Sequence, residues 1–253
     1  MDMEVTRIRE IADELVKLLR IKTVPVGIKL FESKDSIPKE YKCIKMKLAF
    51  CHFIGLARFR EESVLVTKEN STSCAIGSYA LGFGNIPQGW AEKNVGRFAG
   101  TIEAVEKARS GIKPFTQNKY IAFGVAPLNK TPLIPDIVQI FGNPLQLLEL
   151  VYSNTWNGDK NIGLETNGHG ASCYEALVIP YLTKRIRLAI ADMGDRRYGY
   201  AGDEELIMGV PIESLERLFL GLKKTMQTIN RYPILYNFLP VPKEVAEKIS
   251  ADN

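Results

Sequence analysis

Two stretches of the sequence decide the fold: FCHFIGLARFREESVLVTKE at residues 50–69 and SCYEALVIPYLTKRIRLAIAD at residues 172–192. Each begins with an apolar segment headed by a cysteine, continues through a short charged turn and ends in a run of aliphatic residues. The first pattern predicts a short helix over residues 51–60 and a strand over 63–67. The second predicts a helix that opens at its cysteine and a strand over 186–191. The chain therefore contains two similar helix–strand units.

Two more pairs of segments resemble one another across the halves. They are TVPVGIKLF (23–31) with LIPDIVQIF (133–141), and GNIPQGWAEKNVGRF (84–98) with MGVPIESLERLFLGL (208–222). Segments that recur in the same order indicate an internal duplication. Duplicated units commonly pack about a pseudo-twofold axis, and ligand pockets favour such junctions. We therefore predict an α/β (or α+β) fold in which two similar halves pack as one compact body.

The remaining periodicity completes the predicted element order. It indicates an amphipathic helix over 4–20, a strand over 24–31, a helix from Cys74, a long helix over 88–110 and a buried strand over 120–128. The expected division is an N-terminal helix at 1–22, a first repeat at 23–118, a second repeat at 119–240 and a C-terminal tail at 241–253. No linker rich in proline, glycine or serine separates the halves, which favours one body over two hinged domains.

Composition and charge argue against several classes of protein. The 253 residues are 45% hydrophobic and 25% charged, and the net charge of +4 comes from 33 basic and 29 acidic residues scattered along the chain. Scattered charge argues against nucleic-acid binding, and the lack of a run of about 18 apolar residues argues against a membrane span. No secretory signal precedes the four cysteines, so we expect a cytoplasmic location with reduced thiols.

Three of the cysteines stand at predicted helix starts. Cys51 opens CHFIGLAR, Cys74 follows the N-cap run STS, and Cys173 follows GAS. The free N–H groups and partial positive charge of a helix start favour thiolate, the form that binds metal and attacks electrophiles. Three thiolates with one open position suit an iron–sulfur cluster that binds substrate, or a single metal ion with an exchangeable ligand. A reactive thiol and inert core residues are the alternatives.

Two further groups are candidates for the same site. His169 lies in ETNGHGAS (165–172), a loop of small residues entering the second cysteine helix, where a histidine suits a ligand or a proton carrier. Arg196 and Arg197 lie in ADMGDRRYGYAGDEE (191–205), which we interpret as a Gly-rich turn whose arginine forks suit an anion. The alternative is a surface turn whose arginines pair with its own acidic residues.

The roles of the other histidine and the other cysteine stay open. His52 is adjacent to Cys51, where it could be a site residue or could simply face away from the cysteine. Cys43 lies in YKCIKMKL, an alternating strand-like run, and is expected to be structural.

The order of FCHFIGLAR, SCAIGSYALG, PDIVQIFGNP, SCYEALVIPYLT, DMGDRRYG and DEELIMGVP resembles the domain-of-unknown-function 169 family over about residues 8–238. The family it resembles is prokaryotic and largely uncharacterised, so the resemblance supplies a pattern of residues and no activity. It implies cysteines at the positions of Cys51, Cys74 and Cys173. It also implies a frequent fourth cysteine just before the Gly-Asp-Arg sequence, where this chain has Asp192 and Met193. The expected site therefore has three cysteines with an open position or another ligand.

Two hypotheses follow, and whether the chain is an enzyme stays open. The first is a metal- or iron–sulfur-binding protein, a redox or small-molecule enzyme with its site between the repeats. Its three cysteines would hold the metal ion or cluster, His169 would carry a proton or act as a ligand, and Arg196 or Arg197 would anchor an anionic small molecule. The second is a non-enzymatic small-ligand module or an accessory subunit of a redox complex. A homo-oligomer is the default expectation for either.

Overall fold

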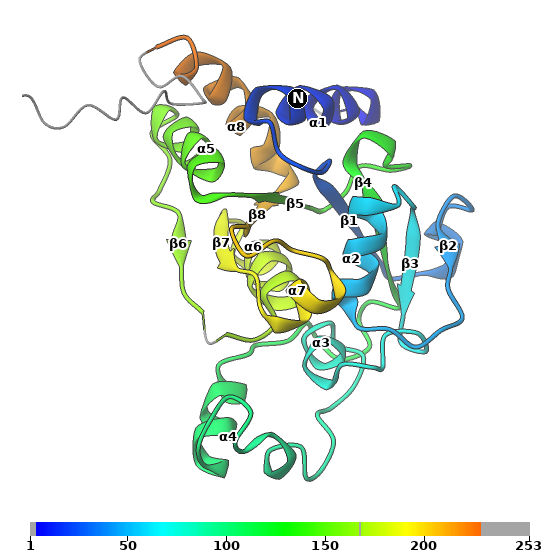
Figure 1. Cartoon of the computed structure of the whole chain (residues 1–253). Helices are drawn as coiled ribbons and strands as arrows, with labels where there is room; N and C mark the ends of the chain where they lie inside the picture. The colour runs from blue at the N-terminus through cyan, green and yellow to red at the C-terminus, as the bar shows by residue number, and fades with distance from the viewer. Residues whose placement is uncertain (1–3, 167, 229–253) are drawn as a thin grey trace, which may run out of the picture.

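The computed structural model describes residues 4–166 and 168–228, which form helices packed on both faces of an eight-stranded mixed sheet (Figure 1). The strands are β1 (Val26–Phe31), β2 (Lys42–Cys43), β3 (Val64–Thr67), β4 (Ala122–Pro127), β5 (Ile137–Gly142), β6 (Gly163–Leu164), β7 (Arg187–Ile190) and β8 (Leu206–Pro211). The α-helices are α1 (Val5–Leu19), α2 (Phe50–Phe59), α3 (Ala75–Ala80), α4 (Ile102–Ser110), α5 (Pro144–Trp156), α6 (Ile179–Thr183), α7 (Met193–Tyr198) and α8 (Ile212–Thr225). Three 3₁₀ turns, η1 (Lys34–Ser36), η2 (Glu92–Asn94) and η3 (Leu128–Lys130), and a π-helix, η4 (Ala171–Val178), complete the described elements.

The strands stand in the order β2-β3-β4-β1-β5-β8-β7-β6. Among the described strands, the outermost pairs at the two edges are parallel and the others are antiparallel. β1 and β5 pair at the centre, with Val26 opposite Gln139. If β1, β2, β3 and β4 are matched with β5, β6, β7 and β8 respectively, the strand order read from one edge of the sheet to the centre equals the order read from the other edge. Each half also places a helical segment before its third strand, α2 or η4 with α6, and another after it, α3 or α7.

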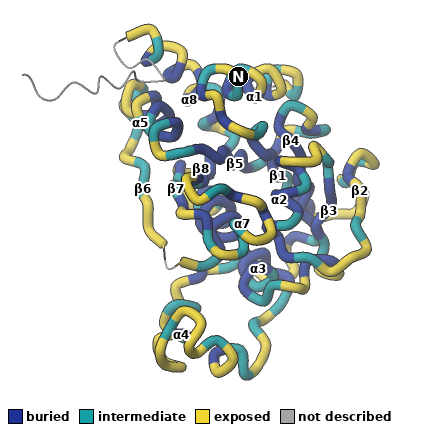
Figure 2. Tube along the Cα trace, in the orientation of Figure 1, coloured by how far each residue is buried: buried dark blue, intermediate teal, exposed yellow. Residues whose placement is uncertain are grey.

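Alternating side chains give the sheet two apolar faces. On β5, Ile137 and Phe141 pack in the same core as α2 and η4, whereas Val138 and Ile140 pack with α1, α5 and α8. This alternation follows from the twofold period of a strand. α1 joins the second core because its apolar residues recur on one side at helical spacing. Figure 2 shows the resulting pattern, with buried central strands and exposed outer turns of the helices.

The π-helix η4 lies unusually close to the sheet. A Cβ on Gly209 of β8 would lie 2.4 Å from the carbonyl oxygen of Ala176, so a larger residue there would push η4 away. The side-chain amide of Gln139 donates to the carbonyl oxygens of Ser172 at 2.6 Å and Ala176 at 3.3 Å. These contacts fix the start of η4, and π-helical turns are frequent at functional sites.

The structure corrects the prediction of one long helix over residues 88–110. Turns, η2 and α4 occupy this segment instead. Gly96 has a φ of 81°, a left-handed conformation that interrupts a helix. The expected equivalence of residues 84–98 with 208–222 is therefore also wrong, because the latter form the end of β8 and most of α8.

Residues 191–205, predicted as a Gly-rich turn, contain the short helix α7. It forms because the side chain of Asp192 caps its first N–H groups. The predicted helices and strands at 4–20, 24–31, 51–60, 63–67, 120–128 and 186–191 correspond to α1, β1, α2, β3, β4 and β7 within a few residues. The predicted tail at 241–253, and the last part of the second repeat, lie outside the described residues. Within the described ranges, no helix combines the length and apolar character needed to cross a bilayer.

Candidate functional site

The starts of four helices meet at a cavity of about 670 Å³, which we call the thiol cavity. α2 and α3 come from the first half of the chain, and η4 and α7 come from the second. α2 contacts both η4 and α7, and α3 contacts η4. The segment between α3 and α4 adds further lining residues. The cavity is therefore built by both halves of the chain.

Three cysteine thiols line this cavity. Cys51 lies in the first turn of α2, Cys74 is the N-cap of α3, and Cys173 lies in the first turn of η4. Gly77 lies between two of them, because a Cβ built on it would be 3.7 Å from the Sγ of Cys74 and 3.8 Å from the Sγ of Cys173. A Cβ built on Gly194, at the start of α7, would be 3.4 Å from the Sγ of Cys51. The fold thus brings together the three cysteines that the sequence selects.

The carboxylate of Asp192 ties two of the helix starts to each other. One oxygen accepts the N–H groups of Gly170 at 2.6 Å and Ala171 at 3.2 Å, at the start of η4. The other accepts the N–H groups of Gly194 at 2.7 Å and Asp195 at 3.0 Å, at the start of α7. Four backbone donors hold this side chain, so it positions the walls of the cavity and has little capacity left to bind a ligand.

Asp195 is the second carboxylate of the cavity, and it is 2% exposed. Its Oδ2 accepts the N–H groups of Ser172 at 3.2 Å and Asp192 at 3.4 Å, whereas its Oδ1 has no hydrogen-bond partner in the described part of the chain. Burial raises the pKa of Asp195 to about 7, and the charge of Asp192 adds to the effect. The carboxyl group is therefore partly protonated near neutral pH.

Burial acts in the same direction on the pKa of the three thiols. Burial raises the pKa of Cys51, Cys74 and Cys173 above the ordinary value of 9.0, with smaller contributions from Asp192 and Asp195. The N–H of Gly77, 3.4 Å from the Sγ of Cys74, opposes this effect without reversing it. Burial beside carboxylates thus opposes the thiolate form that the helix starts are expected to favour.

The donor set nevertheless fits a cationic group. Within residues 4–166 and 168–228, no three cysteine, histidine, aspartate or glutamate side chains already stand in the arrangement that coordinates one metal ion. A cluster of several irons places each thiolate on a different iron, so its ligands need not stand as close as those of one ion. Metal binding displaces the protons of thiols, and a cation would also offset the negative charge of half-buried Asp192 and buried Asp195.

Aromatic side chains form one wall of the cavity. The ring centroids of Trp90 and Phe98 are 6.0 Å apart, and those of Phe98 and His169 are 3.8 Å apart at an edge-on angle of 66°. Burial lowers the pKa of His169 although Asp192 opposes this, so the imidazole is neutral near pH 7. Of these three residues, the sequence selects only His169 as a site residue, because Trp90 and Phe98 fall inside the predicted long helix. The glycines that flank them in GWAEKNVGRF are the signal of a loop.

The two candidate arginines are separated by the fold. Arg197 lines the thiol cavity, as does Arg97 from the segment before α4. Arg196 does not line it, because its guanidinium donates to the carbonyl oxygen of Gly202 at 2.9 Å and to Asp203 at 3.0 Å. Arg196 thus follows the surface-turn interpretation, and Arg197 keeps the candidate role.

The structure places the two residues whose roles the sequence leaves open. His52 accepts the N–H of Ala49 at 3.1 Å and stacks on Tyr198 with ring centroids 4.4 Å apart, so it secures the start of α2. Cys43 is exposed on β2. Neither residue lines the thiol cavity.

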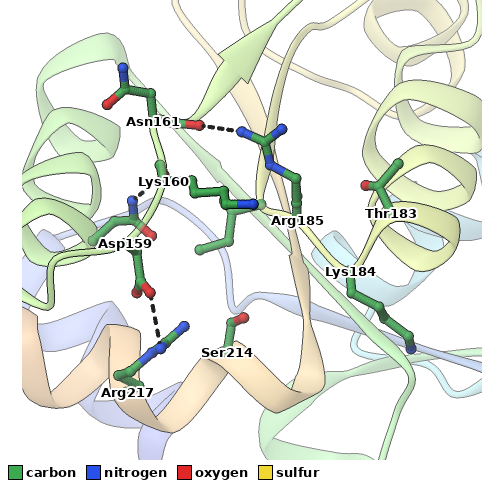
Figure 3. Close-up of a pocket in the computed structure, with 10 residues that line it drawn as sticks. Asp159, Lys160, Asn161, Thr183, Lys184, Arg185, Ser214 and Arg217 are labelled. Atoms are coloured by element: carbon green, nitrogen blue, oxygen red, sulfur yellow. Dashed lines mark hydrogen bonds and ion pairs between the residues drawn. The ribbon is translucent and has the colours of Figure 1, made fainter.

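Another hollow, of about 350 Å³, is lined by residues of α5, α6 and α8 and of the segments 159–161 and 184–186, and we call it the basic cavity (Figure 3). Four basic side chains line it: Lys160, Lys184, Arg185 and Arg217. Arg217 pairs with Asp159 at 2.9 Å, Arg185 donates to the carbonyl oxygen of Asn161 at 3.1 Å, and Lys184 pairs with Glu213 at 2.9 Å. Two of the four charges are thus compensated by acidic side chains, and a third side chain has a carbonyl partner.

Comparison with known proteins yields a family model and one curated relative. The model, described as DUF169, an uncharacterised ArCR, matches residues 14–220. An uncharacterised protein of Methanocaldococcus jannaschii is 28% identical over 228 residues, which cover 89% of this chain and 97% of the relative. No solved structure gives a significant match.

Proposed function

The chain belongs to the DUF169 family, as the order of its motifs predicts, and we propose that Cys51, Cys74 and Cys173 bind an iron–sulfur cluster or a single metal ion. In this proposal the thiol cavity also takes a small molecule, which makes the protein a redox or small-molecule enzyme. The observation that carries the proposal is that three thiols from three helix starts line one cavity. A bound metal or cluster would supply electron transfer or Lewis-acid activation there.

The distribution of charge supports a cationic group. Asp192 and Asp195 lie beside the thiols, and the two arginines that line the described cavity are exposed. No lysine is among the described lining residues. Backbone N–H groups already stabilise Asp192, and the buried guanidinium of Arg58 acts on Asp195; a cation bound at the thiols would offset the remaining negative charge.

Two other residues have roles in the proposal. His169 is neutral and lines the same cavity, so it can accept a proton from a bound molecule. Arg197 lines the cavity and would anchor an anionic group. Both side chains come from the second half of the chain, whereas two of the three thiols come from the first.

We also propose that the two halves descend from one duplicated unit and pack about a pseudo-twofold axis between β1 and β5. The symmetric strand order and the equivalent places of Cys51 and Cys173 support this idea. It is tested by an experimental structure in which a rotation of about 180° superposes β1, α2, β3 and α3 on β5, η4, β7 and α7. Helices that superpose on opposite faces of the sheet would contradict it.

Anaerobic purification tests the metal or cluster. We expect the wild-type chain to contain iron and sulfide, or one equivalent of a metal such as zinc, and we expect Cys51→Ser, Cys74→Ser and Cys173→Ser each to lose it. Cys43→Ser is the matched control, because that thiol is exposed on β2 and should not affect metal content. A wild-type chain that purifies without metal and stays metal-free after anaerobic reconstitution would falsify the proposal.

A second candidate is a non-enzymatic module that binds a small ligand. The aromatic wall of Trp90, Phe98 and His169 favours it, because those side chains need no metal to bind an organic molecule. Ligand binding that is equally tight in the wild type and in the three cysteine variants would support this second function over the first.

A further inference from the structure

We infer that the small molecule of the thiol cavity is an aromatic carboxylate, with its ring on Trp90 and Phe98 and its carboxylate on Arg97 and Arg197. This inference deepens the proposed function and rests on it, because the same cavity would place the molecule beside the metal-binding thiols. It is carried by two independent features of the lining, a pair of arginines and an aromatic wall.

The arginines of the thiol cavity differ from most others in the chain. Arg97 and Arg197 make no ion pair and no side-chain hydrogen bond within the described ranges, although Arg197 lies over the ring of Tyr198. By contrast, Arg196 is bonded to Gly202 and Asp203. Arg97 and Arg197 come from opposite halves of the chain, and both line one cavity. Two guanidinium groups with free donors suit a carboxylate, which accepts from both of its oxygens.

The acidic groups of the cavity do not neutralise these arginines. The carboxylate oxygens of Asp192 accept four backbone N–H groups. Asp195 is buried, and its pKa is raised to about 7. The exposed part of the cavity therefore presents positive charge, while its inner part presents thiols and carboxyl groups. An anionic ligand would enter with its charged end at the exposed side.

The aromatic wall selects the body of the ligand. Trp90 and Phe98 form a tilted pair with an interplanar angle of 42°, and Phe98 is 39% exposed. A planar ring gains stacking contacts with these side chains that a puckered ring of the same size does not. A cation would also bind such faces, but the two arginines repel it. The cavity volume of about 670 Å³ lies within the range of small-molecule sites.

Fluorescence titration tests the inference with a reporter that the chain supplies. Trp90 lies in the cavity and Trp156, the other tryptophan, is 57% exposed on α5. In a Trp156→Phe background, we expect benzoate and 2-naphthoate to change the emission of Trp90. Benzamide, which lacks the charge, and cyclohexanecarboxylate, which lacks the plane, should each bind at least about tenfold more weakly, and calorimetry gives the same ranking without a fluorophore.

Variants at adjacent positions separate a specific site from a general effect of charge. Arg97→Gln and Arg197→Gln should each weaken naphthoate about tenfold, because each removes a charge-assisted bond. Arg196→Gln is the matched control, since it removes the same charge one residue away and should leave affinity within about twofold. Benzamide binding as tightly as benzoate, no binding of either aryl carboxylate, or an Arg196→Gln effect equal to that of Arg197→Gln would each overturn the inference.

Metal analysis of the same preparations keeps the two proposals apart. If aryl carboxylates bind a chain that never holds metal, the proposed metal function fails and the ligand class stands. If the chain holds metal but binds no aryl carboxylate, the ligand class fails and the metal function stands.

Discussion

The thiol cavity and the basic cavity lie on one chain, yet they compensate charge in opposite ways. The acids of the thiol cavity are held by backbone N–H groups, four of them on Asp192 alone. Two of the charges of the basic cavity are instead held by other side chains, Arg217 by Asp159 and Lys184 by Glu213. Backbone donors are fixed by the fold, whereas exposed side chains can rearrange. Charge in the thiol cavity is therefore coupled to folding, and charge in the basic cavity is coupled mainly to solvent.

The largest expected effect comes from the aspartate that ties η4 to α7. Asp192→Ala should lower the free energy of unfolding by about 3 kcal/mol, because two helix starts lose their side-chain caps. Asp159→Ala, in the basic cavity, removes an ion pair whose arginine is 55% exposed and should cost less than about 1 kcal/mol. Urea unfolding of both variants measures the difference. Equal costs would mean that the two cavities do not differ in the way described.

The next largest expected effect is the pH dependence of the free energy of unfolding. The pKa of Asp195 rises on folding from the ordinary 3.8 to about 7, so the folded chain binds more protons than the unfolded chain between these values. The free energy of unfolding of the metal-free protein should therefore fall as pH rises from about 4 to about 7, and this contribution should be constant above that range. Asp195→Asn should remove this slope, and Asp159→Asn should leave it unchanged. Thermal unfolding at several pH values checks both, and a slope that survives in Asp195→Asn would contradict the assignment.

The sequence predicted the parts of the thiol cavity that have local signals. A cysteine ahead of an apolar helix is visible in the sequence at Cys51, Cys74 and Cys173, and all three reach the cavity. The apolar runs that form β1 and β4 likewise predicted strands. Such features depend on neighbours within one turn or one strand, so they can be inferred before the fold is known.

The features that the sequence did not predict depend on contacts between distant segments. The carboxylate of Asp192 bridges to Gly170, and the raised pKa of the thiols follows from burial that only the assembled helices create. The segment carrying Trp90 and Phe98 was mistaken for a helix because its apolar residues recur at helical spacing. The left-handed conformation of Gly96 interrupts a helix there. The segment instead contributes the aromatic wall of the thiol cavity.

Thiol reactivity sharpens the comparison of the cavities. We expect iodoacetamide at pH 8 to alkylate Cys51 and Cys173 at least about tenfold more slowly than a cysteine introduced as Ser214→Cys in the basic cavity. The new thiol would lie in the first turn of α8 beside Arg217, where the helix start and the basic side chain favour thiolate. Peptide mass spectrometry gives both rates in one protein, and the exposed Cys43 serves as the internal standard. Faster alkylation of Cys173 than of residue 214 would show that burial does not protect the thiol cavity.

The smallest expected effect concerns the one side chain of the basic cavity whose charge has no partner in the described part of the chain. Lys160 lines the cavity with three other cations and makes no ion pair there, so Lys160→Ala removes repulsion and little attraction. We expect a change of at most about 0.5 kcal/mol in the free energy of unfolding, in the direction of higher stability.

Salt separates this cause from a change in packing, because the Debye length falls from about 30 Å at 0.01 M to about 3 Å at 1 M. The gain should therefore be measurable at low salt and vanish at high salt, while Lys39→Ala, an exposed lysine outside both cavities, should respond to neither condition. A loss of stability that persists at high salt would mean that the aliphatic part of Lys160 stabilises the cavity by packing. The basic cavity would then be coupled to folding, as the thiol cavity is.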